Sequence, residues 1–188
     1  MSFPPSPESH PPATVLTLGH PVLRQVAQPV VNVHAPPVQQ LIDQLLTTVQ
    51  AANGVGIAAP QMGWPVQILV VASRPNLRYP QAPLMAPTVL INPRLVAASE
   101  NSELGWEGCL SVPGVRGRVL RHRWVEVEYL DRQGQPHRQR WEGFVARIFQ
   151  HEADHLVGKV FLDRVLSESD LLSEDDYQAM EIATLPTV

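Results

Sequence analysis

His151-Glu152-Ala153-Asp154-His155 is the stretch that decides the fold, because it places two imidazoles and a carboxylate within a segment of helical periodicity. Apolar residues recur at helical spacing over Gly143–Val157, and Gly158 ends the pattern. Residues four apart lie on one face of a helix, so both histidines can reach one metal ion. Glu152, one step round the helix, borders the open coordination position. The stretch therefore predicts a metal-binding helix over residues 143–157.

A third metal ligand must come from elsewhere, because catalytic metal sites usually have three protein ligands and keep one position for water. A metzincin would have a histidine six positions after His155, but that residue is Phe161. A thermolysin-like site would use a downstream glutamate, and Glu168 or Glu174 could serve. The other candidate is Cys109, which flanking glycine and a nearby Pro-Gly place on a tight loop that could present a thiolate. A set of two histidines and a cysteine suits iron(II), zinc, nickel or cobalt.

The glycine-rich segment Gly54-Val55-Gly56-Ile57-Ala58-Ala59-Pro60-Gln61 is similar to a dinucleotide fingerprint, but its context differs. It follows a helical pattern instead of a strand, and no acidic residue stands about twenty positions later to bind a ribose. Glycines here are better suited to bring bare backbone N–H and C=O groups against an extended ligand. Gln61 adds a side-chain amide donor to this segment.

The remaining pattern predicts one domain over residues 15–166, between a disordered Pro-rich tail over 1–14 and an acidic tail over 167–188. Helical periodicity over Val38–Ala52, entered through two prolines and closed by Asn53-Gly54, predicts an N-terminal amphipathic helix. The acidic tail is expected to be a solvated end or a marginal short helix. The expected strands, rich in β-branched residues, are Val66–Val71, Thr88–Asn92, Arg94–Ala98, Val115–Leu120, Trp124–Leu130 and, as a hairpin partner, Gln135–Trp141.

Composition restricts the possible partners and the compartment. The chain has 188 residues, a formal net charge of -4 and scattered basic residues, so direct binding to nucleic acid is not expected. Its single cysteine cannot form an intramolecular disulfide, which favours a reducing cytoplasm. No apolar run is long enough to cross a membrane.

Three segments together resemble the peptide deformylase family. Residues 54–61 (GVGIAAPQ) are similar to its first motif, residues 107–111 (EGCLS) to its second and residues 150–155 (QHEADH) to its third, in the same order and at similar separations. The resemblance includes Gly19–Arg24 and covers roughly residues 15–164. Three motifs in order are far more specific than any one of them.

The resemblance implies an α+β fold, with mixed, mostly antiparallel β-sheets around a central metal-binding helix. It also implies removal of the formyl group from N-formylmethionine on new polypeptides, with release of formate. The implied partners are N-formylmethionyl peptides and the ribosome near its exit tunnel. The implied cofactor is one divalent metal per chain. This metal is expected to be Fe²⁺ in the cell, and Zn²⁺, Ni²⁺ or Co²⁺ could replace it in a preparation. Carried over by position, the metal ligands are Cys109, His151 and His155; the catalytic groups are Glu152, Gln61 and the backbone N–H of Leu110; and the substrate-binding residues are Gly54, Val55, Gly56 and Arg116.

In this reading Glu152 takes a proton from the attacking water and returns it to the leaving amine, and Cys109 is a ligand and not a nucleophile. Arg116 has either a structural or a substrate-orienting role. Phe144 and Ile148 lie two turns and one turn before His151, so we expect them to line an apolar pocket for the methionine side chain.

Two departures from the family's pattern affect the expected shape of that pocket but not the chemistry. Trp106 precedes the second motif, and Arg147 stands where many members of the family have an aliphatic residue. Two alternatives stay open: a small zinc peptidase with the same histidines and glutamate, and a binding module with a structural metal. Only a deformylase would release formate from formyl-Met-Ala.

Overall fold

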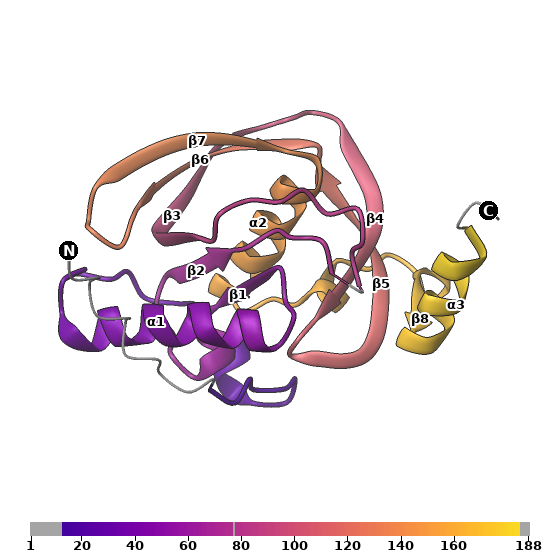
Figure 1. Ribbon diagram of the computed structural model, residues 1–188, viewed down its shortest axis with the longest axis horizontal. Coiled ribbons are helices and arrows are strands. Elements are labelled where there is room, and N and C mark those ends of the chain that lie inside the picture. Colours follow the sequence, from indigo (N-terminus) through magenta and orange to yellow (C-terminus); the bar gives the residue numbers. More distant parts are fainter. Residues whose placement is uncertain (1–12, 77, 185–188) are drawn as a thin grey trace, which may run out of the picture.

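Two antiparallel sheets and three α-helices form the structure, a computed structural model that describes residues 13–76 and 78–184 (Figure 1). Of the expected Pro-rich tail, residues 1–12 lie outside the described residues. The helices are α1 (Pro36–Ala51), α2 (Gly143–Leu156) and α3 (Glu174–Thr184), with short 3₁₀ turns at η1 (Pro21–Arg24), η2 (Ala59–Met62), η3 (Phe161–Arg164) and η4 (Glu168–Asp170).

The first sheet has five strands in the order β1-β2-β3-β6-β7, and the second has three in the order β4-β5-β8. All the strand pairs within both sheets are antiparallel, whereas an isolated bridge between Gln28 and Val66 is parallel. The mixed α+β class with antiparallel sheets is therefore confirmed. The strands are β1 (Gly56–Ala58), β2 (Ile68–Val71), β3 (Thr88–Ala98), β4 (Ser102–Cys109), β5 (Val112–His122), β6 (Trp124–Leu130), β7 (Pro136–Glu142) and β8 (Leu171–Ser173).

Strand β2 is apolar throughout because helices cover both of its faces. Leu69 and Val71 pack in the cluster that contains Ile148 and Phe149 of α2. The alternate β2 residues belong to a second cluster, together with Leu41, Ile42, Leu45 and Val49 of α1. Each fully buried side chain of this size contributes about 1.5–3 kcal/mol relative to an exposed one. This packing fixes α2 against the sheet whose edge strand is β1.

Helix α2 lies among the strands, where it contacts β1 and β2 of the first sheet and β5 of the second (Figure 1). It begins directly after β7, at Gly143, so the chain passes from the sheet into the helix without a loop. Its imidazoles are consequently carried by a rigid, largely buried element. The next long helix along the chain, α3, lies at the far end of the molecule beside β8 (Figure 1).

The strands differ in part from the sequence-based prediction, which did not include β1, β4 or β8. Thr88–Asn92 and Arg94–Ala98 were expected as two strands, but β3 is continuous and includes Pro93 at a shift of register opposite β6. Proline lacks an N–H, and a bulge removes the need for one. Cys109 was expected on a loop, but it is the last residue of β4 and pairs with Val112 across the tight turn into β5.

The acidic segment after Arg164 forms η4, β8 and α3. Strand β8 adds to the second sheet by pairing with β5, and Ser173 accepts a hydrogen bond from the backbone N–H of Asp176, which caps the start of α3. The acidic residues of the first turn of α3 suit the positive end of the helix dipole. Among the described residues, no helix combines the length and apolar character needed to cross a bilayer.

Candidate metal centre

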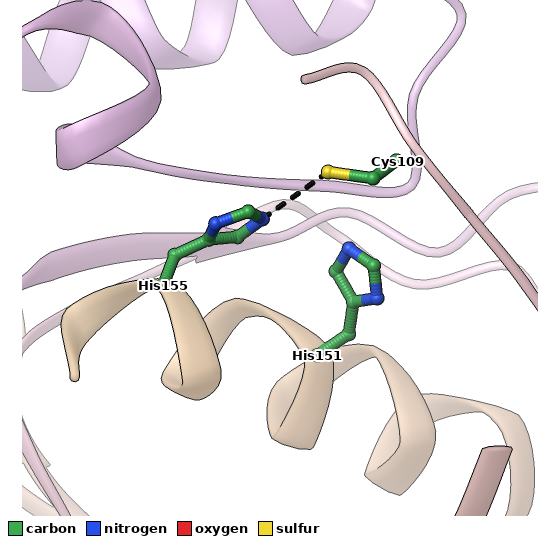
Figure 2. Close-up of side chains that lie close together, drawn as sticks. All are labelled: Cys109, His151 and His155. Atoms are coloured by element: carbon green, nitrogen blue, oxygen red, sulfur yellow. Dashed lines mark hydrogen bonds between the residues drawn. The ribbon is translucent and has the colours of Figure 1, made fainter. Parts of the chain in front are cut away.

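Cys109, His151 and His155 form one buried cluster, drawn in Figure 2. The two imidazoles rise from neighbouring turns of α2 toward the sulfur atom at the end of β4. The Sγ atom of Cys109 lies 3.3 Å from Nε2 of His155, and all three candidate ligand atoms lie within 4.8 Å of one another. Atoms bound to one ion at about 2.0–2.3 Å lie within roughly 4.6 Å of each other. The cluster therefore fits a single ion after a small adjustment.

The chemistry of these donors also fits a divalent transition metal. Burial alone would raise the pKa of the Cys109 thiol. The neighbouring His155 and His151 together have a larger, opposite effect, so the pKa of the thiol is well below its ordinary value. The sulfur is therefore favoured as thiolate, the form that binds metal. Neither Glu168 nor Glu174, the alternatives for a third ligand, belongs to this cluster.

Glu107 supports the cluster through the ring of His151, and it also lines the cavity. Its Oε2 accepts a hydrogen bond from Nδ1 of His151 at 2.9 Å, and its Oε1 accepts one from Nε of Arg121 at 2.9 Å. Burial alone would raise the pKa of the Glu107 carboxyl, but these hydrogen bonds lower it far below its ordinary range. Arg121 also donates to Asp154 at 2.7 Å, so a buried ionic network runs along the base of α2.

The sequence-based prediction did not assign roles to Glu107 and Arg121. Glu107 lies in the second motif, but nothing in the local pattern indicates that it faces a histidine 44 residues later. A carboxylate that binds the second nitrogen of a metal-ligating histidine is a common supporting partner, and this rule is the signal that could have identified it.

Glu152 lies beside the ligand cluster with its carboxylate in a tight space. Its side chain is buried, and its Oε2 has no hydrogen-bond partner among the described residues. Burial, together with Cys109 and Glu107, raises the pKa of this carboxyl to about 7, against the opposing effect of the two histidines. Gly56 of β1 makes room for it, because a Cβ atom there would lie 2.5 Å from Oε1 of Glu152.

Gln61 is held in one orientation. Its Oε1 accepts a hydrogen bond from the backbone N–H of Ala58 at 2.8 Å, which turns the amide nitrogen toward Cys109 and Ser111. The Nε2 atom lies 3.5 Å from the Cys109 sulfur and 3.2 Å from Oγ of Ser111. Leu110, the other predicted oxyanion residue, follows Cys109 directly and lines the same cavity.

A cavity of about 550 Å³, part of it open solvent, lies in front of the cluster. Most of the predicted residues share it: Gly54, Val55, Gly56, Gln61, Cys109, Leu110, Phe144, Ile148, His151 and Glu152 line its wall. His155 belongs to the metal cluster but is not among these lining residues. Further lining residues that the sequence did not indicate are Asn53, Arg78, Tyr79, Glu107 and Gly108, together with Arg147, which was noted only for its departure from the family's pattern.

Arg116 is not among the residues that line the cavity. Its side chain is 1% exposed, and its guanidinium donates to both carboxylate oxygens of Glu174 and to the hydroxyl of Tyr79. Burial alone would lower the pKa of this guanidinium, but Glu174 and Tyr79 raise it above its ordinary value. The structure therefore places Arg116 among protein partners, next to Tyr79 of the cavity wall.

Comparison with known proteins gives a consistent family. The sequence profile described as "Polypeptide deformylase" matches residues 12–170. A protein named peptide deformylase 2 from Nostoc sp. is 54% identical over 166 residues, which cover 88% of this chain and 93% of that protein. Peptide deformylase 1 from Bordetella pertussis is 44% identical over 151 residues, covering 80% of this chain and 86% of that protein.

Solved structures agree with the sequence comparisons. A class I type b peptide deformylase from Acinetobacter baumannii, crystallised with Met-Ala-Ser, matches with a TM-score of 0.80 and 44% identity over 82% of this chain and 98% of that one. A peptide deformylase from Synechococcus elongatus in complex with actinonin matches with a TM-score of 0.76 and 38% identity over 90% of this chain and 87% of that one. The chain therefore belongs to the polypeptide deformylase family, and its activity is the metal-dependent hydrolysis that removes the N-formyl group from newly synthesised polypeptides.

Proposed function

We propose that Cys109, His151 and His155 hold one divalent ion per chain and that this ion is Fe²⁺ in the cell. The single observation that carries the proposal is that one thiolate and two imidazoles converge at a buried point beside the cavity. Such a mixed sulfur and nitrogen set also accepts Zn²⁺, Ni²⁺ or Co²⁺ in a preparation. When bound, the ion supplies a Lewis acid that polarises the formyl carbonyl and makes water a better nucleophile.

Glu152 moves the proton in this proposal. Its carboxylate takes a proton from the attacking water and delivers it to the amine nitrogen of the departing peptide. The unpartnered Oε2 supports this role, because a buried carboxylate oxygen without a protein partner is free to hydrogen-bond with water or substrate. The close approach of Gly56 holds the carboxylate against the cavity wall and limits the positions that it can take.

Gln61 and the backbone N–H of Leu110 stabilise the negative charge that develops on the formyl oxygen. For Gln61 the support is its fixed amide: the bond from Ala58 holds the oxygen, so the nitrogen faces the cluster before any charge appears. Donors that are already oriented need no reorganisation in the transition state, which is where such groups contribute most.

The peptide part of the substrate lies along the edge of β1. Within the described part of the chain, this strand is at the edge of its sheet and pairs with β2 alone. Gly54, Val55 and Gly56 line the cavity at this edge, where backbone groups can pair with an extended peptide as an added strand. The A. baumannii relative with Met-Ala-Ser bound supports a ligand of this kind.

The methionine side chain of the substrate enters a pocket lined by Phe144 and Ile148. Both belong to α2 and line the cavity together with His151, so the apolar surface adjoins the metal ligands. Methionine is flexible and polarizable and fits such irregular apolar surfaces well. We take the substrates to be N-formylmethionyl peptides of nascent chains, met near the ribosomal exit tunnel in the cytoplasm, where a reducing environment preserves the Cys109 thiolate.

The test is formate release from formyl-Met-Ala by chain loaded without oxygen with Fe²⁺, and separately with Ni²⁺, Co²⁺ or Zn²⁺. Acetyl-Met-Ala is the matched substrate control, because it presents the same peptide with a different acyl group. Rapid release of formate from the first substrate alone is expected. Fully loaded protein that releases no formate with any of these metals contradicts the proposal, and cleavage of internal peptide bonds would instead indicate a peptidase.

A further inference from the structure

Arg116 is a buried cation that joins three parts of the chain. It lies in β5, and its guanidinium meets Glu174 at the start of α3 and Tyr79 in the segment between β2 and β3. Because a buried charge without an opposite charge is strongly unfavourable, its position depends on a carboxylate. Among the described residues, the ion pair of Arg116 is with Glu174, which stands 58 residues later in the sequence.

The pair with Glu174 is bidentate. Nε of Arg116 lies 2.7 Å from Oε2, and Nη2 lies 2.9 Å from Oε1. Two parallel hydrogen bonds fix the plane of the guanidinium as well as its position. The ring centroid of Tyr177, one turn further along α3, lies 4.7 Å from Cζ of Arg116, so the guanidinium plane is contacted from two successive turns of the helix. The C-terminal segment thus determines how Arg116 is oriented.

The third nitrogen of the same guanidinium reaches toward the cavity wall. Nη1 of Arg116 donates to the hydroxyl of Tyr79 at 2.7 Å, and the ring of Tyr79 packs on Phe144 with ring centroids 4.9 Å apart. Tyr79 and Phe144 both line the cavity that contains Glu152 and the metal cluster. A line of direct contacts therefore runs from Glu174 through Arg116 and Tyr79 to the pocket for the substrate side chain.

Arg116 also packs on the strand that carries Cys109. A Cβ atom at Gly108 would lie 2.9 Å from Cζ, Nε and Nη1 of Arg116, so the flat guanidinium covers this backbone position closely. The guanidinium is consequently confined between Gly108, Tyr79 and Glu174.

We propose that Glu174 is a positioning residue for substrate binding: through Arg116 it holds Tyr79 against Phe144 and so completes the wall of the side-chain pocket. This inference rests on the proposed function of that pocket. It gives the C-terminal segment β8–α3 a part in the specificity of a site to which it contributes no lining residue. Glu174 itself belongs neither to the lining of the cavity nor to the cluster of candidate metal ligands.

Removing the charge of Glu174 leaves Arg116 without its counter-ion. The guanidinium then gains by moving toward water, the hydroxyl of Tyr79 loses its donor, and the ring is no longer held against Phe144. A wall that no longer contacts the methionine side chain weakens binding in the ground state and the transition state alike. Such a loss raises KM and leaves kcat nearly unchanged.

The experiment compares Glu174→Ala, Glu174→Gln and Tyr79→Phe in the full metal-loaded chain. Asp175→Ala is the matched control. Asp175 is the next residue of α3 and its side chain is exposed, so this substitution removes the same charge without touching Arg116. For Glu174→Ala we expect KM for formyl-Met-Ala to rise about tenfold at nearly constant kcat, the size typical of coupling between contacting residues. Glu174→Gln, which keeps the volume and one hydrogen bond, should show a smaller rise.

Three readouts separate positioning from general destabilisation. Metal content should be unchanged in every variant, the preference for formyl-Met over formyl-Ala peptides should fall in Glu174→Ala, and Glu174→Ala combined with Tyr79→Phe should be less than additive. The inference is overturned if Glu174→Ala behaves like Asp175→Ala, if kcat and metal content fall while KM is constant, or if the double variant is additive.

Binding of the unformylated peptide Met-Ala-Ser, measured by calorimetry, tests the same inference without turnover. Weaker binding to Glu174→Ala than to Asp175→Ala supports it, even if the wild-type chain were found to release no formate. Equal binding to the two variants contradicts it, whatever the deformylase assay shows. The positioning role and the proposed function can thus fail separately.

Discussion

Nδ1 of His151 donates a hydrogen bond to Oε2 of Glu107 at 2.9 Å. The other oxygen of Glu107 accepts hydrogen bonds from Arg121 at 2.9 Å and from Arg147 at 3.0 Å, so the carboxylate cannot turn away from the ring. This arrangement fixes the tautomer of His151 and leaves Nε2 for the cluster with Cys109. The electronegative partner also makes the imidazole a stronger donor to a metal.

Replacing Glu107 should weaken metal binding. For Glu107→Gln we expect the affinity for Zn²⁺ or Co²⁺ to fall about 10- to 100-fold, the usual effect of removing such a supporting carboxylate. Competition with a chromophoric chelator measures this affinity directly. Glu103→Gln is the control, because Glu103 lies in the same strand with an exposed side chain. Equal affinities for the two variants would contradict the assigned role.

Cys109→Ala and Glu152→Ala should fail in different ways. Removing the sulfur deletes one of three proposed ligands, so metal and activity are lost together. Removing the carboxylate leaves the ligands in place, and we expect normal metal content with activity lowered by about 10² to 10⁴, the range typical of a general acid-base group. Formate release and metal content are measured on the same preparations. A Glu152→Ala variant with near-normal turnover would contradict the proton-transfer step.

Gly105 and Arg147 should be coupled in stability. A Cβ atom at Gly105 would lie 2.8 Å from Cζ of Arg147, whose guanidinium also donates to the carbonyl oxygen of Val119 at 2.9 Å. Gly105→Ala should therefore lower the free energy of unfolding by about 1–3 kcal/mol, as overpacking usually does. In an Arg147→Ala background the same change should cost much less. Urea unfolding of the four proteins gives the cycle, and strict additivity would show that the close approach is relieved elsewhere.

The Arg116–Glu174 pair should make stability depend on pH in the acid range. The hydrogen bonds from Arg116 lower the pKa of Glu174 below its ordinary value, near 4.3 in an unfolded chain. The stability that the ionised Glu174 provides is therefore fully present above about pH 5 and is lost as pH falls through the folded-state pKa. The difference in unfolding free energy between wild type and Glu174→Gln should be constant from pH 5 to 7 and shrink toward pH 3. A difference that grows on acidification would refute the pairing.

Features with a local pattern were predictable from the sequence. The alternation of Val125, Val127 and Tyr129 indicates β6, whose bounds in the structure are those expected. The period of the segment that carries His151 indicates α2, which ends one residue before the predicted end. Three motifs in order also indicated many of the residues that line the cavity, because they report a whole family's arrangement and not one local geometry.

Features that depend on distant pairings were not predictable. The continuity of β3 through Pro93 depends on a bulge against β6, and no local rule signals that compensation. Glu174 was weighed only as a metal ligand, because an isolated glutamate in an acidic segment carries no sign of a buried arginine 58 residues earlier. Ion pairs of this kind have no periodicity, so a single sequence does not reveal them.

The two sources of the metal cluster have a thermodynamic consequence. Cys109 ends a strand of the three-stranded sheet, whereas His151 and His155 stand on a helix packed against the five-stranded sheet. An ion held by all three would act as a cross-link between two halves of the fold, and it would bind the unfolded chain poorly. At a free concentration 100 times its dissociation constant, it would add about 2.7 kcal/mol to the unfolding free energy. The melting temperature of this chain should accordingly report the free metal concentration around it.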